Sequence, residues 1–279
     1  MAGGLFDGPT GVWDTVLNWT TGVPVTGDLA SVPASQVNDV IGPTGANQNV
    51  DLDIFETHPE YRGDVGSSGS PIILASSLVH AKGSGSFFFK TSKNGGSNFV
   101  TDEVRIETSS PSTRVEIGSD AGDVNSNIER VNIHRGHGIL VGDIRFSATS
   151  VVVLSSLVGD EATCKIVQSA DTLPDYKQIR GRGEIDNLVT RLAILGGTCI
   201  KDVNAANIID VYPGGNLVYN HAAIATDVTV CRVHTGATLD LNQNGRIKVF
   251  DLTYRYRGAT IHYTPAIHTL NIIDLDRES

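Results

Sequence analysis

A short glycine phrase recurs at a fixed interval near the end of the chain. It begins at Gly214, Gly236 and Gly258, so both intervals are 22 residues (236 − 214 and 258 − 236), and a looser copy begins at Gly197. Each copy separates two runs of β-forming residues, and glycine suits a corner that needs positive φ or close backbone approach. A fixed period of this size is typical of stacked units that bury their apolar faces against one another. The sequence therefore predicts a β-solenoid with these four glycines at corners of its turns.

The predicted class is all-β. The chain has 30 glycines among 279 residues, and glycine inside a helix costs about 1 kcal/mol relative to alanine. A parallel β-helix and an antiparallel β-sandwich both supply many short strands with turns between them. The repeated phrase favours the β-helix, because sandwiches rarely repeat a phrase at one interval. Periodicity does not decide whether residues 184–194 form a short helix or two strands.

Three sections are expected along the chain. Residues 1–34 contain Trp13 and Trp19 and several prolines, which suits a cap over the open end of a solenoid, and we expect both tryptophans to be core. Residues 35–264 form the solenoid body. Residues 265–279 form a final strand over the last turn or a strand exchanged with a partner subunit.

Composition and charge argue against nucleic acid and membrane as partners. The formal charge is −10 with no basic run, so we expect no nucleic acid. No apolar run approaches the roughly 20 residues that span a bilayer, so we expect no membrane. The first residues lack the features of a secretory signal, which predicts synthesis in the host cytoplasm. The three cysteines, Cys164, Cys199 and Cys231, lack paired spacing and are expected to be buried thiols.

No catalytic residue, metal or cofactor is predicted. A β-helix enzyme usually cleaves polysaccharide with two carboxylates, and Glu184 with Asp186 could supply them, yet a chain with 31 acids contains such pairs by chance. His134 and His137 should lie on opposite faces of a strand.

Tyr254, Tyr256 and Tyr263 form the best aromatic cluster. They suit a seam between turns or subunits, and less well a sugar-binding surface.

Two phrases carry a resemblance to a known group of proteins. The first is Trp-x4-Asn-Trp-Thr-Thr-Gly-x-Pro-x-x-Gly-Asp, from Trp13 to Asp28, and the second is Tyr-x-Gly-x-Val-Gly-x-x-Gly-x-Pro, from Tyr61 to Pro71. With the glycine phrases, they resemble the right-handed parallel β-helix structural proteins of tailed bacteriophages, which include tailspike-like trimers that decorate or cement the capsid. The opening phrase also occurs in secreted autotransporter β-helices.

The resemblance implies a non-enzymatic capsid decoration or cement protein on the virion surface. It implies a homotrimer that binds the major capsid protein, and we expect Trp13, Trp19 and Asp28 to mark the contact segment. One alternative is a phage tailspike or tail fibre protein that binds or degrades host surface polysaccharide. Another is a bacterial surface adhesin.

Overall fold

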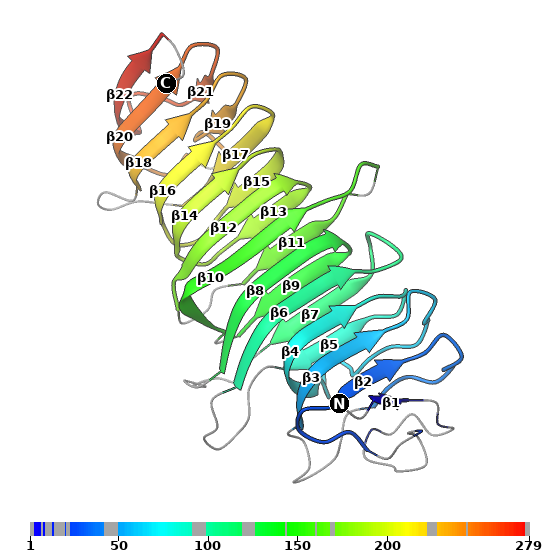
Figure 1. Cartoon of the computed structure of the whole chain (residues 1–279). Coiled ribbons are helices and arrows are strands. Elements are labelled where there is room, and N and C mark those ends of the chain that lie inside the picture. The colour runs from blue at the N-terminus through cyan, green and yellow to red at the C-terminus, as the bar shows by residue number, and fades with distance from the viewer. Residues whose placement is uncertain are drawn as a thin grey trace.

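The strands of this chain stack in parallel into a β-solenoid of about ten turns (Figure 1). The structure is a computed structural model that describes residues 3–6, 8, 13, 20, 23–41, 50–90, 99–118, 126–142, 144–159, 161–167, 171–221, 228–243 and 245–276. These residues contain strands and no helix. The predicted all-β parallel β-helix is confirmed, and every pairing between two named strands is parallel, unlike those of a sandwich.

Two parallel sheets form the walls of the rod. The first sheet contains β1 (Gly3–Leu5), β2 (Leu29–Val32), β3 (Val50–Thr57), β4 (Ile72–Ala81), β6 (Phe99–Glu107), β8 (Ser126–Arg135), β10 (Arg145–Ser155), β12 (Leu173–Arg180), β14 (Val189–Ile194), β16 (Ala206–Val211), β18 (Val228–Val233), β20 (Val249–Tyr256) and β22 (Thr269–Leu275). The second sheet contains β5 (Phe87–Lys90), β7 (Arg114–Gly118), β9 (His137–Val141), β11 (Thr163–Ile166), β13 (Arg182–Ile185), β15 (Gly197–Lys201), β17 (Gly215–Tyr219), β19 (Thr238–Asp240) and β21 (Thr260–His262). Residues 184–185 thus belong to β13 and residues 189–194 to β14, and the segment forms no helix.

The core consists of side chains stacked in columns between the sheets. One column of the second sheet contains Phe87, Val115, Gly138, Cys164, Gly183, Cys199, Leu217, Leu239 and Ile261. Tyr176 enters from β12, and a Cβ at Gly183 would overlap its hydroxyl group. The tyrosine therefore fills the space that the glycine leaves, which maintains close packing where the column lacks a side chain.

The repeated glycines lie on consecutive turns. Gly214, Gly236 and Gly258 have φ values of 82°, 74° and 84°. The N–H of Gly214 donates to the carbonyl of Gly236 at 3.2 Å, and the N–H of Gly236 donates to that of Gly258 at 3.1 Å. They form one line of corners along the rod. Gly197 also has positive φ, but its register partner is Gly215, so it lies one residue away from that line.

The two ends of the rod differ. At the N-terminal end β1 and β2 belong to the first sheet, and the buried rings of Phe6 and Trp13 pack beside them. At the other end β22 pairs with β20 as the last strand of that sheet. Apolar side chains of the last turn are half-buried, because no later turn lies over them in the described residues; they include Ile261, Leu270, Ile272 and Leu275.

Candidate functional site

The segment expected to contact a capsid is partly buried. The side chain of Trp13 is 1% exposed, and its ring packs between Phe6 and Phe55 at centroid distances of 6.5 and 5.9 Å. It belongs to the core and is not available to a partner. The carboxylate of Asp28 accepts a hydrogen bond from the N–H of Val25 at 3.1 Å and shapes a surface turn. Trp19 lies outside the described residues.

The structure gives the three tyrosines different surroundings. Tyr256 is buried and stacks on His234 at 4.7 Å. Tyr254 lies beside Arg232 in the register of β20 and β18. Tyr263 is partly buried and packs against the hydrophobic core. Tyr256 and Tyr263 therefore serve packing between turns.

Of the two carboxylates considered for catalysis, Glu184 binds a neighbouring turn. Glu184 forms an ion pair with Lys165 at 3.1 Å, and burial raises the pKa of Asp186. Glu103, which lies elsewhere on the first sheet, accepts hydrogen bonds from Arg105 of its own strand at 3.0 Å and from Asn132 of the next turn at 2.8 Å.

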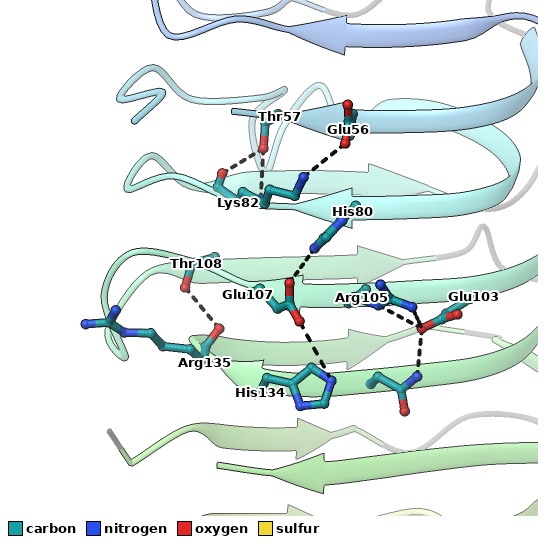
Figure 2. Close-up of polar contacts among 11 residues, drawn as sticks. Glu56, Thr57, His80, Lys82, Glu103, Arg105, Glu107, Thr108, His134 and Arg135 are labelled. Atoms are coloured by element: carbon teal, nitrogen blue, oxygen red, sulfur yellow. Dashed lines mark hydrogen bonds and ion pairs between the residues drawn. The ribbon is translucent and has the colours of Figure 1, made fainter. Parts of the chain in front are cut away.

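A polar row crosses four turns of the first sheet, and Figure 2 shows its first three members, His80, Glu107 and His134. Nε2 of His80 lies 2.7 Å from Oε2 of Glu107, and Oε1 of that carboxylate lies 3.9 Å from Nε2 of His134. Nδ1 of His134 lies 2.7 Å from Oγ of Ser155. The row places hydroxyl, imidazole and carboxylate in the order found in nucleophilic hydrolases, but 3.9 Å is too long for a hydrogen bond. Burial lowers the pKa of His80, against the opposing effect of its hydrogen bond to Glu107.

Sequence analysis missed this row. Its members are separated by 27, 27 and 21 residues (107 − 80, 134 − 107 and 155 − 134). Unequal turn lengths hide the alignment, so no sequence signal marks it. His134 ends up in β8 and His137 in β9, in different sheets, with the positive-φ corner Gly136 between them. The two histidines therefore do not converge.

A second charged cluster surrounds Asp210. The carboxylate side chain is 2% exposed and accepts hydrogen bonds from Arg191 at 3.3 Å and Arg232 at 2.9 Å. Its hydrogen bond and negative charge raise the pKa of Arg232. Both guanidinium groups remain partly exposed, at 50% and 39% of the side chain. Asp210 thus anchors two arginines on the outer face of the first sheet.

A hollow of about 240 Å³ lies beside this cluster. Its lining includes Asp175, Lys177, Arg191, Ala193, Leu195 and Tyr212. The outward row here runs from Lys177 to Ala193 and then to Asp210, so the smallest side chain lies between two longer ones. The hollow exists because Ala193 leaves this position of the row nearly empty. It lies over β12 and β14, which run side by side in Figure 1.

Among the described residues, no group of three or more His, Cys, Asp or Glu could hold a metal ion. The three cysteines are buried, and burial raises the pKa of the Cys199 thiol to about 12. The described residues include no helix with the length and hydropathy that crossing a lipid bilayer requires.

Comparison with known proteins adds no relative. No protein-family model, no curated protein and no solved structure matches the chain. The structure itself establishes the parallel β-solenoid.

Proposed function

We propose that the chain is a non-enzymatic structural protein of a tailed-bacteriophage virion. In this proposal it is made in the host cytoplasm, forms a homotrimer and binds the major capsid protein on the outside of the head. The resemblance of its motifs and the parallel β-solenoid support this role together. Its work would be to hold neighbouring capsid subunits in place.

The observation that carries the proposal is the pairing of outward-facing charges between adjacent turns. Lys82 binds Glu56 at 3.0 Å, and Asp210 binds arginines from the turns on both sides. One exposed ion pair contributes only about 0–1 kcal/mol. Repeated along a continuous hydrogen-bond ladder, however, such pairs oppose local opening of any single turn. A rod of this kind suits a part that must keep its shape under load.

We place the head-binding surface at the N-terminal third of the rod. A hollow of about 950 Å³ lies there, lined by residues of the loops after β2, β3 and β4 and by Ser109. Val37 borders it and is 85% exposed. An exposed apolar side chain at the edge of a polar hollow suits contact with a protein partner.

The test uses heads assembled without the chain. Purified chain should cosediment with them at a fixed stoichiometry, raise the temperature at which they release DNA, and show the mass of a trimer by light scattering. Val37→Asp should weaken binding, whereas Ile179→Asp, which alters another exposed apolar residue outside that hollow, should not. Absence of the chain from purified virions, together with failure to bind heads, would reject the proposal.

A further inference from the structure

We propose that the hollow above Ala193 binds an acidic sugar, with one uronic acid residue seated against Tyr212. This binding activity goes beyond the structural role proposed above and does not depend on it. The inference combines an aromatic wall, a pair of accessible cations and a hollow of suitable size.

The aromatic wall is the end of a stacked column. Tyr212 stacks on His234 at 4.6 Å with 7° between the planes, and His234 stacks on Tyr256 at 4.7 Å with 9°. The column fixes the orientation of the first ring. Tyr212 and Leu195 both line the hollow, so the ring borders it beside an apolar side chain. A rigid ring face of this kind can pack against the apolar C–H face of a pyranose.

The cations beside the ring can hold a carboxylate. Lys177 is exposed and has no ion-pair partner among the described residues. Arg191 donates one hydrogen bond to Asp210, and half of its side chain is exposed. Because a guanidinium group has five N–H donors, Arg191 keeps donors for a ligand carboxylate while Asp210 holds it in place. Two accessible cations meet here in a chain of net charge −10.

The rest of the hollow suits a sugar better than a bare anion. Asp175 lines it and can accept hydrogen bonds from ring hydroxyl groups. A small inorganic anion would use the cations and leave the tyrosine face and Asp175 without a partner. The volume of about 240 Å³ has room for a single sugar ring. The lining residues therefore point to a ligand that is apolar on one face, carries hydroxyl groups and bears one carboxylate.

The experiment measures binding of a galacturonic acid trisaccharide to the full chain by calorimetry and by saturation-transfer NMR. The neutral galactose trisaccharide and sodium sulfate serve as comparison ligands. Lys177→Gln should weaken binding about tenfold, the effect of losing one charged hydrogen bond. Ala193→Gln should abolish binding by filling the hollow. Arg257→Gln removes an exposed cation of the last turns and should leave the affinity unchanged.

Each outcome decides the proposal. Binding of the acidic trisaccharide that is lost in Ala193→Gln and weakened in Lys177→Gln, but not in Arg257→Gln, supports it. Absence of binding at millimolar concentration, equal binding of the neutral sugar, or sulfate binding as tightly as the sugar would overturn it. Circular dichroism of each variant establishes that the solenoid is intact. Head binding measured on the same variants separates this result from the structural role.

Discussion

Two glycine corners should respond very differently to alanine. Gly236 has φ of 74° and nothing within 4 Å of the position of an added Cβ. Gly197 has nearly the same φ, 73°, but an added Cβ would overlap the carbonyl oxygen of Gly181 and lie 2.8 Å from its nitrogen. The first substitution tests backbone conformation alone. The second adds a collision between turns.

The magnitudes follow from these surroundings. A non-glycine residue in the left-handed region costs about 1–2 kcal/mol, and alanine recovers roughly 0.4–1 kcal/mol by restricting the unfolded chain. Gly236→Ala should therefore cost about 1 kcal/mol. Forcing a side chain against packed groups adds about 1–3 kcal/mol, so Gly197→Ala should cost roughly 3 kcal/mol.

Thermal unfolding followed by circular dichroism checks both values. For a chain of this size, about 1 kcal/mol lowers Tm by roughly 2–4 °C, so Gly197→Ala should lower Tm by about three times as much as Gly236→Ala. Gly236→Asn is the control, because asparagine tolerates positive φ and should cost less than alanine. Equal losses at Gly197 and Gly236 would refute the proposed difference between an open corner and a crowded one.

Three further predictions use the charged and buried groups. Asp210→Asn should lower stability by about 1–2 kcal/mol in urea unfolding, because both arginines lose a charged partner but remain solvated; an unchanged midpoint would contradict this. Burial lowers the pKa of four histidines, His80, His137, His221 and His268. The folded state therefore binds fewer protons than the unfolded one, and Tm should fall as pH drops below about 6.5. A constant Tm from pH 7.5 to 5 would contradict this prediction. The three buried thiols should not react with a disulfide reagent until denaturant is added, and rapid labelling of native protein would show that the core opens.

The repeat predicted the fold because it preserves the length of a turn. Where turns keep 22 residues, Gly214, Gly236 and Gly258 reach the same corner, and the spacing is visible in the sequence. Gly197 shares the positive φ but aligns with Gly215, 18 residues later (215 − 197), so it falls outside the 22-residue period. Corner chemistry can therefore be predicted, while register depends on loop lengths.

The polar clusters could not be predicted, because their members become neighbours only through the register between turns. Glu107 meets His80 and His134 only because register offsets of 25 residues between β4 and β6 and of 27 residues between β6 and β8 place them on adjacent strands. The hollow needs a small residue at Ala193 between longer side chains, and a single sequence does not show which residues become row neighbours. Trp13 illustrates the opposite case, since its expected place in the core follows from residue type alone.

Parallel stacking also gives the molecule a regular spacing along its axis. Each turn advances the chain by about 4.8 Å, the spacing of paired strands. Any two outer features are therefore held apart by whole multiples of that step. Inserting or deleting one turn between the N-terminal hollow and the hollow above Ala193 would change their separation by one step and leave the internal chemistry of each untouched. The number of turns between two points of attachment thus sets the distance between them.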